Sequence, residues 1–187
     1  LTLNICTNNI EVKKPVMIWI HGGALVTGGS SSIMYELEHL AKKGIVVVSI
    51  NYRLGPLGFL RLDEATNGQI NSSGNEGLMD QRNAIKWVKE NISSFGGDPN
   101  NITIFGESAG SWSCNLQIAA GDDNLFQKAI CQSGGLDAIA SKEKANQWAK
   151  LFIEQYKKDG HKVSDLRSCE WELIINTAKK LKHSALS

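Results

Sequence analysis

Residues 102–110 read ITIFGESAG, and this stretch decides the fold. Its first four residues are β-branched or aromatic, which predicts a buried strand. A Gly-x-Ser-x-Gly turn follows at residues 106–110, and we expect a helix to begin directly after Ser108. A strand, this turn and a helix, in that order, are typical of a nucleophile elbow, in which a strained turn lifts a serine hydroxyl above the sheet. The helix N-terminus beneath the serine favours a developing negative charge.

The two glycines of the motif, Gly106 and Gly110, leave room for the strand and the helix to approach each other closely. A Gly-x-Ser-x-Gly turn alone also fits an ordinary strand-to-helix connection, because Gly and Ser are common turn residues. The strand before the turn and the helix after it favour the nucleophile elbow over that alternative.

The rest of the chain alternates short apolar runs with helical patterns, which predicts an α/β fold with a central, mainly parallel sheet flanked by helices. Further strands are predicted at residues 16–20, 45–50 and 128–132. Helices are predicted at residues 33–43 and 77–95, the second with its apolar face at Ile85, Val88, Ile92 and Phe95. Residues 51–75 are predicted to be a long irregular connection, and residues 138–187 a helical segment that follows the core strands.

The loop after the first predicted strand reads HGGA, from His21 to Ala24. Small residues let a backbone come within about 3 Å of a developing oxyanion, which its N–H groups then stabilise. By itself the loop also fits a glycine-rich turn without a role, but its pairing with the elbow favours the first interpretation. His21 precedes Ser108, whereas the triad order in this kind of enzyme is serine, acid, histidine, so we interpret His21 as a loop-shaping residue.

Several longer motifs occur in one order along residues 1–135, and together they are specific. They are WIHGGA at residues 19–24, NYRLGPLGF at 51–59, GNEGLMDQ at 74–81, FGGDP at 95–99, FGESAG at 105–110, LF at 125–126 and QSG at 132–134. In these motifs the chain resembles the type-B carboxylesterase and cholinesterase family, whose members have the α/β-hydrolase fold.

The resemblance implies roles for four residues: Ser108 as the catalytic nucleophile, and the backbone N–H groups of Gly23, Ala24 and Ala109 as the oxyanion hole. Ala24 stands where the family often has glycine, and its N–H can still donate if its backbone angles accommodate a Cβ.

Four other positions bear on the expected site. Trp112 stands where many relatives have a small residue. Arg53, Asp80 and Asp98 are interpreted as buried or loop-fixing polar residues without a catalytic role.

The triad acid and histidine of the family are expected after Ser108, yet we find neither in this sequence. The later histidines, His161 and His183, lie in hydrophilic segments. The later glutamates are expected on solvated helix faces; they are Glu143, Glu154, Glu170 and Glu172. The sequence therefore predicts a partial α/β-hydrolase domain over residues 1–187, truncated at both ends and inactive by itself.

Composition excludes several other classes of protein. Lys plus Arg number 20 and Asp plus Glu 19, so the net charge of +1 indicates no nucleic-acid partner. The longest apolar runs are too short for a membrane span, which takes about 20 residues. The four cysteines form no CxxC pair, so neither a zinc site nor any other metal or cofactor is expected.

Two features bear on the protein's environment. Cys114 and Cys131 lie in apolar contexts and are expected to be buried free thiols. Sequons at Asn71, Asn91 and Asn101 are compatible with a secreted or endoplasmic-reticulum-lumenal protein, which is slightly favoured.

The leading functional hypothesis is a carboxylic ester hydrolase that acts on a small-molecule ester through an acyl-enzyme intermediate. One alternative is a non-catalytic adhesion or binding protein of the same family, which keeps the fold and loses the triad. Another is a short protein that binds or regulates full-length partners. The intact elbow around Ser108 favours the hydrolase.

Overall fold

The computed structural model describes residues 1–32, 35, 37–121, 124–136 and 139–184. The chain forms two compact units, each of which draws on two separate stretches of sequence. The first unit contains Leu1–Tyr52 and Leu78–Ala138, and the second contains Arg53–Gly77 and Ile139–Ser187. Ser108 and the loop at residues 21–24 belong to the first unit.

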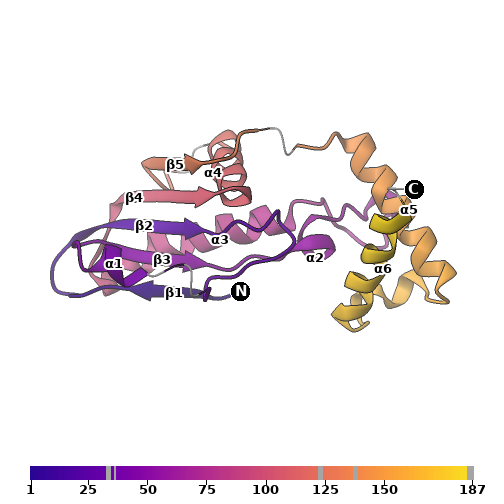
Figure 1. The fold of residues 1–187 in the computed structure, drawn as a ribbon, viewed down its shortest axis with the longest axis horizontal. Helices are drawn as coiled ribbons and strands as arrows, with labels where there is room; N and C mark the ends of the chain where they lie inside the picture. Colours follow the sequence, from indigo (N-terminus) through magenta and orange to yellow (C-terminus); the bar gives the residue numbers. More distant parts are fainter. Residues whose placement is uncertain (33–34, 36, 122–123, 137–138, 185–187) are drawn as a thin grey trace. The chain divides into compact units, whose positions relative to one another are not determined.

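A five-stranded sheet forms the centre of the first unit (Figure 1). Its strands in spatial order are β1 (Leu3–Cys6), β3 (Val46–Ile50), β2 (Lys14–Ile20), β4 (Gly97–Glu107) and β5 (Lys128–Gln132). Strand β1 runs antiparallel to β3, and all other neighbours are parallel. The prediction of a mainly parallel sheet is confirmed.

Burial explains which strands the sequence predicted well. All five residues of β3 are buried, and Val16, Ile18 and Ile20 of β2 are fully buried. Strand β1 was not predicted, because it is short and only partly buried at the sheet edge. Strand β4 begins at Gly97, five residues before the predicted start, because pairing with β2 holds the backbone extended through a stretch with turn-like sequence.

Strand β5 lies at the other edge of the sheet, and most of its residues are exposed. This position corrects the expectation for one cysteine. Cys114 is a buried free thiol as predicted, whereas Cys131 on β5 is a free but exposed thiol. The apolar context of Cys131 does not bury it, because an edge strand has a neighbour on one side only.

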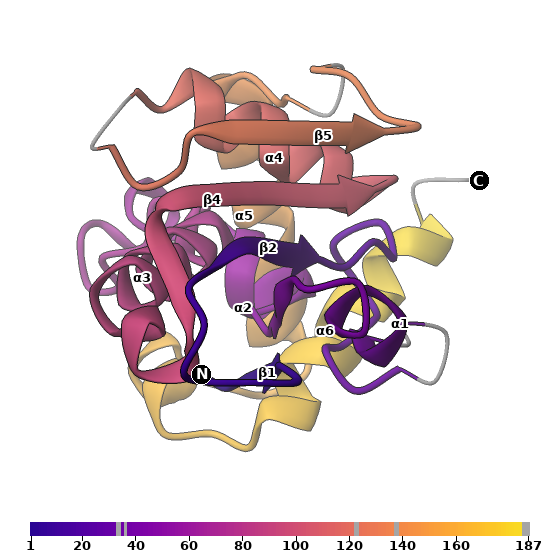
Figure 2. The ribbon, with the colours of Figure 1, turned by 90° about the vertical axis from the view of Figure 1, so that its left-hand side faces the viewer.

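The helices α1 (Leu37–Ala41), α3 (Glu76–Asn91) and α4 (Ala109–Ala119) accompany the sheet, and only the first two residues of α3, Glu76 and Gly77, belong to the second unit. Figure 2 shows α1 and α3 on opposite faces of the sheet. The predicted helix at 33–43 is observed over Leu37–Ala41, and residues 33, 34 and 36 lie outside the described residues. The predicted helix at 77–95 consists of α3 and the 3-10 turn η2 (Ile92–Phe95).

The predicted apolar face of that helix is confirmed at three of its four positions. Ile85, Val88 and Ile92 are fully buried in the core, and Phe95 is half-buried.

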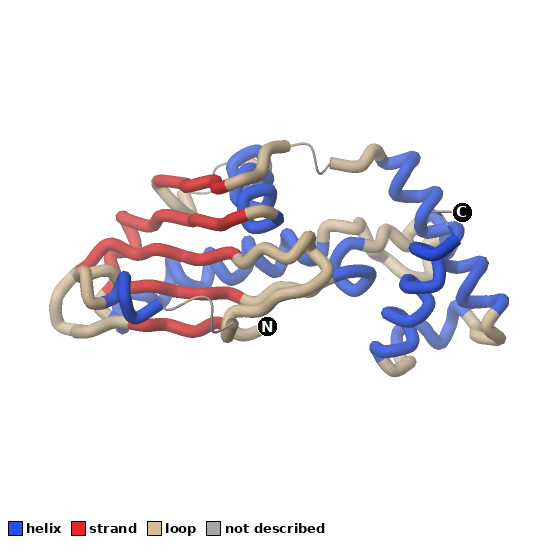
Figure 3. Tube along the Cα trace, in the orientation of Figure 1, coloured by secondary structure: helices blue, strands red, loops and turns tan. Residues whose placement is uncertain are grey.

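The second unit is helical (Figure 3). It contains α2 (Gly55–Phe59), η1 (Glu64–Thr66), α5 (Lys142–Lys158), η3 (Val163–Arg167) and α6 (Trp171–Ser184). The described part of 139–184 contains no strand, in agreement with the helical pattern of its sequence.

The prediction that residues 51–75 are irregular is wrong in part, because this stretch contains α2 and η1. Their formation follows from burial: Leu60, Leu62 and Ile70 pack against the core around Phe152 and Tyr156 of α5. The apolar residues needed for this packing are scattered among glycines and polar residues, so no helical period is visible in the sequence.

Candidate active site

Ser108 occupies a strained turn between the end of β4 and the start of α4. Its backbone angles are φ 55° and ψ −121°, a conformation that residues other than glycine rarely adopt. Two hydrogen bonds hold the residue in place: its N–H donates to the carbonyl oxygen of Gln132 (2.9 Å), and its own carbonyl accepts from the N–H of Trp112 (3.1 Å). The surrounding backbone therefore imposes the strain, and the half-buried Ser108 side chain lies beside the N-terminus of α4.

The glycines on either side of Ser108 allow β4, α4 and β2 to come into backbone contact. A Cβ on Gly110 would lie 2.0 Å from the carbonyl oxygen of Ile20 at the end of β2. A Cβ on Gly106 would lie 2.5 Å from the carbonyl carbon of Gly110. Gly134 makes a third close approach, 2.7 Å from such a Cβ to the carbonyl oxygen of Ser108. The close approach expected from the sequence is thus observed.

The loop after β2 lies directly beside the turn at Ser108. A Cβ on Gly22 would be 2.7 Å from the carbonyl oxygen of Glu107 and 3.3 Å from the Cβ of Ser108. Gly23 has φ 108° and Ala24 has φ 53°, so both residues are in the left-handed region. Ala24 adopts this conformation despite its Cβ.

The donors proposed for the oxyanion hole are available for a ligand. The carbonyl oxygen of Gly23 accepts hydrogen bonds from the N–H groups of Val26 and Thr27, both 3.0 Å long, which close the turn. Over the described residues, no hydrogen bond occupies the N–H groups of Gly23 and Ala24. Ala109 is the first residue of α4, and its N–H has no acceptor within the helix.

His21 shapes this loop. Its Nδ1 lies 2.8 Å from the carbonyl oxygen of Gly22, so Nδ1 carries the proton, and its ring stacks on Tyr52 with ring centres 4.4 Å apart. The Tyr52 hydroxyl donates to the carbonyl oxygen of His21 (2.7 Å). Burial lowers the pKa of His21, against the opposing effect of the bond to Gly22, so the neutral ring is favoured.

Asp98, Asp80 and Arg53 are the charged residues that we interpret as non-catalytic. Asp98 accepts from the N–H of Asn100 (2.9 Å) and pairs with Lys13 (3.1 Å), and these contacts lower its pKa. Asp98 therefore makes structural contacts, but it lies within β4 and not in the loop that the sequence suggested. Asp80 is buried, as expected, and Arg53 of the second unit is exposed.

A set of polar contacts behind Ser108 was not predicted from the sequence. The Ser111 hydroxyl donates to the carbonyl oxygen of Gly134 (2.7 Å). The Ser113 hydroxyl donates to the carbonyl oxygen of Ala109 (2.9 Å) and accepts from Gln81 Nε2 of α3 (3.0 Å). These bonds hold the first turn of α4 against its neighbours. The polar residues at positions 111 and 113 of this mainly apolar helix are the sequence feature that could have indicated these hydrogen bonds.

Trp112 is accommodated by packing against a glycine. Its side chain is half-buried, and a Cβ on Gly134 would lie 2.8 Å from Trp112 Cδ1. The absence of a side chain at Gly134 therefore makes room for the indole beside the turn at Ser108.

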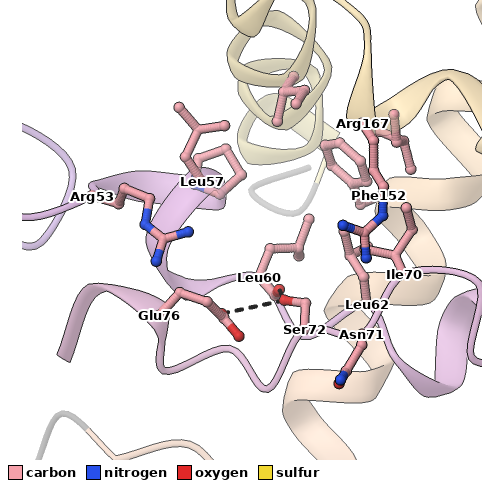
Figure 4. A pocket seen from close by; sticks show the side chains of 13 residues that line it. Arg53, Leu57, Leu60, Leu62, Ile70, Asn71, Ser72, Glu76, Phe152 and Arg167 are labelled. Atoms are coloured by element: carbon pink, nitrogen blue, oxygen red, sulfur yellow. Dashed lines mark hydrogen bonds between the residues drawn. The ribbon is translucent and has the colours of Figure 1, made fainter. Parts of the chain in front are cut away.

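The second unit contains a cavity of about 200 Å³ (Figure 4). Its lining is mainly apolar, from residues such as Leu57, Leu60, Leu62, Ile70 and Phe152. The carboxylate of Glu76 at its edge accepts from the Ser72 hydroxyl (3.2 Å) and from the N–H groups of Ser73 (2.6 Å) and Gly74 (3.0 Å). Glu76 thus stabilises the start of α3.

The four glutamates after Ser108 that were considered as triad acids are exposed, as expected. His161 lies in the second unit against Tyr156 (ring centres 5.0 Å apart), and the side chain of His183 lies outside the described residues. Among the described residues, no group of three or more His, Cys, Asp and Glu side chains is placed to hold a metal ion. No helix in the described part is both long and apolar enough to cross a membrane.

Comparison with known proteins gives consistent matches. The family model described as "Carboxylesterase family" matches residues 1–184. Para-nitrobenzyl esterase of Bacillus subtilis (strain 168) is 42% identical over 185 residues, which are 97% of this chain and 37% of that enzyme. Bile salt-activated lipase of Bos taurus is 48% identical over 150 residues, covering 75% of this chain and 24% of the lipase. The chain thus spans less than half the length of these relatives.

Solved structures agree in fold. The Geobacillus stearothermophilus carboxylesterase EST55 at pH 6.8 superposes with a TM-score of 0.86 at 39% identity, covering 96% of this chain and 40% of that one. A thermophilic PNB esterase superposes with a TM-score of 0.87 at 36% identity, over 99% and 38% of the two chains. These neighbours have the α/β-hydrolase fold, so the predicted fold class is confirmed. The chain belongs to the carboxylesterase family.

Proposed function

We propose that this chain forms the nucleophile-bearing part of a carboxylic ester hydrolase, with Ser108 as the attacking residue. The observation that carries the proposal is the backbone of Ser108, held at φ 55° between the end of a parallel strand and the start of a helix. Strain of this kind persists only where the surroundings over-determine it, and it concentrates at functional sites. Gly106, Gly110 and Gly134 supply those surroundings.

The chemistry follows from the groups around the turn. Ser108 Oγ attacks the ester carbonyl, and the carbonyl oxygen becomes an oxyanion. The N–H groups of Gly23, Ala24 and Ala109 donate to it, since they are free of other acceptors in the described structure. Collapse of the intermediate breaks the bond to the alcohol, which leaves with a proton, and water then cleaves the acyl-enzyme to release the acid.

We further propose that the triad acid and base come from residues outside this sequence. The described histidines of the Ser108 unit are His21 and His39, and both precede the nucleophile. Within the described residues, no hydrogen bond reaches Ser108 Oγ. Loss of the base in a comparable triad lowers kcat by about 10⁶, or about 8 kcal/mol of transition-state stabilisation. The 187-residue chain alone is therefore expected to be almost inactive.

A chimera tests the proposal. The matching segment of the Bacillus subtilis para-nitrobenzyl esterase is replaced by this chain, so that the host supplies the remaining residues. We expect the chimera to hydrolyse p-nitrophenyl acetate and to react with a fluorophosphonate probe. Ser108→Ala should abolish both activities, whereas Ser93→Ala, at an exposed serine of the same unit, should leave them unchanged.

A chimera that melts cooperatively but shows neither turnover nor labelling would argue against the hydrolase and for a non-catalytic relative. The 187-residue chain is assayed in parallel. If it turned over p-nitrophenyl acetate at a rate that depends on Ser108, the proposal that its base lies elsewhere would be wrong.

A further inference from the structure

Two cysteines lie on neighbouring elements behind the turn at Ser108, α4 and β5. Cys114 is on α4 and is fully buried, whereas Cys131 is on the edge strand β5 and is exposed. The two thiols are close enough to interact electrostatically, and both are free in the structure. A disulfide requires the two Cβ atoms to be about 3.5–4.5 Å apart, so only cysteines on adjacent elements can form one.

The close approach of α4 to the sheet explains this proximity. Cys131 pairs in register with Gly106 of β4, the glycine that permits backbone contact with α4. The Ser111 hydroxyl and the Asn115 amide of α4 both donate to the carbonyl oxygen of Gly134, just after β5. Figures 1 and 2 show α4 beside β5. These bonds hold α4 against the end of β5. Cys114 comes one helical turn after Gly110, which contacts Gly106, so it lies on the side of α4 that faces the sheet near Cys131.

We propose that Cys114 and Cys131 are a redox-modification site that a low-molecular-weight disulfide such as glutathione disulfide converts into a disulfide bond. The exposed Cys131 thiolate attacks one sulfur of the small disulfide, which forms a mixed disulfide and releases one thiol. Cys114 gives up its proton and attacks Cys131 Sγ, which breaks the mixed disulfide and releases the second thiol. The protein loses two hydrogen atoms, and the small disulfide is reduced to two thiols.

The order of these steps follows from burial. Burial, together with the neighbouring Cys131 thiol, raises the pKa of Cys114 to about 12. Cys114 therefore stays protonated while Cys131 is a free thiol, and Cys131, which solvent can reach, reacts first.

The other two cysteines have different surroundings. Cys6 lies on β1, at the opposite edge of the five-stranded sheet. Cys169 belongs to the second unit, where its thiol contacts the carbonyl oxygen of Leu166 (3.6 Å). Pairing is therefore expected to be specific.

The bond would reinforce the turn that carries Ser108. Residue 132 follows Cys131 directly, and its carbonyl oxygen accepts from the Ser108 N–H. A link from α4 to β5 closes a short loop around this contact. For a loop of this size the oxidised chain is expected to melt about 5–10 °C higher than the reduced chain.

Peptide mapping of the full 187-residue chain tests the proposal without any assay of catalysis. Trypsin places Cys114 in the peptide 90–128 and Cys131 in the peptide 129–142. After treatment with glutathione disulfide, we expect these two peptides to be linked in the non-reduced digest, while Cys6 and Cys169 remain open to alkylation. The melting temperature should rise with the linked fraction and return after reduction.

Two variants sharpen the test. Cys131→Ser should abolish the link and the rise in melting temperature, and Cys6→Ala, the matched control, should retain both. The proposal is overturned if Cys131 stops at the mixed disulfide, if the link joins other cysteines, or if neither thiol reacts in the folded chain.

Discussion

The substitution Gly110→Ala probes the contact on which the nucleophile turn depends. The new Cβ would lie 2.0 Å from the carbonyl oxygen of Ile20 and 3.0 Å from its carbonyl carbon. A carbon atom and a carbonyl oxygen in contact are about 3.3 Å apart, so α4 and β2 must separate by about 1.3 Å here. Both atoms belong to the backbone, so no side-chain rotation relieves the overlap.

The expected cost is the balance of two effects. Overpacking of this kind costs about 3 kcal/mol, the upper end of the usual range, because two backbones must move. Alanine favours a helix over glycine by about 1 kcal/mol, which offsets part of this cost. The free energy of unfolding should therefore fall by about 2 kcal/mol.

Urea unfolding followed by circular dichroism measures this loss. Gly29→Ala is the matched control, because a Cβ there meets only Asn51 Oδ1 at 3.6 Å, an ordinary contact. Its stability should change by less than about 0.5 kcal/mol. In the chimera, the displaced Ala109 N–H should also slow labelling of Ser108 by about 10²-fold. If Gly110→Ala proved as stable as Gly29→Ala, the close backbone contact would be refuted.

Three further outcomes are expected in urea unfolding experiments. Tyr52→Phe removes the 2.7 Å hydrogen bond to the carbonyl oxygen of His21 and should cost about 1 kcal/mol; an unchanged stability would contradict this. Because burial lowers the pKa of His21 below 6.5, the unfolded state binds its proton more readily, so stability should hold above pH 6.5 and fall below it. His21→Gln should make that fall shallower, and an equal fall would assign it to other groups. Ser141→Ala removes the acceptor for the Lys144 N–H (3.2 Å) at the start of α5 and should lower the free energy of unfolding of the second unit by about 1 kcal/mol. An unchanged free energy would show that this cap does not stabilise the helix.

The accuracy of the sequence-based predictions depended on whether each signal was local. The strand at 45–50 and the elbow at Ser108 were predicted well, because β-branched runs and glycine spacing act within a few residues. The short strand β1 and the helix α2 were missed, because their formation depends on partners distant in the sequence. Cys131 was expected to be buried, and its exposure follows from the position of β5 at the sheet edge.

The sequence by itself determined the fold class and the order of strand, turn and helix around Ser108, because both follow from residue type and short-range periodicity. Only the tertiary structure brought the loop at 21–24 against Glu107 and Ser108, combined residues 53–77 with the helices after 139, and placed Cys114 beside Cys131. Some of these neighbours are more than 80 residues apart along the chain. They meet because strand order and burial of apolar surface decide which distant segments become adjacent, and no local pattern encodes that choice.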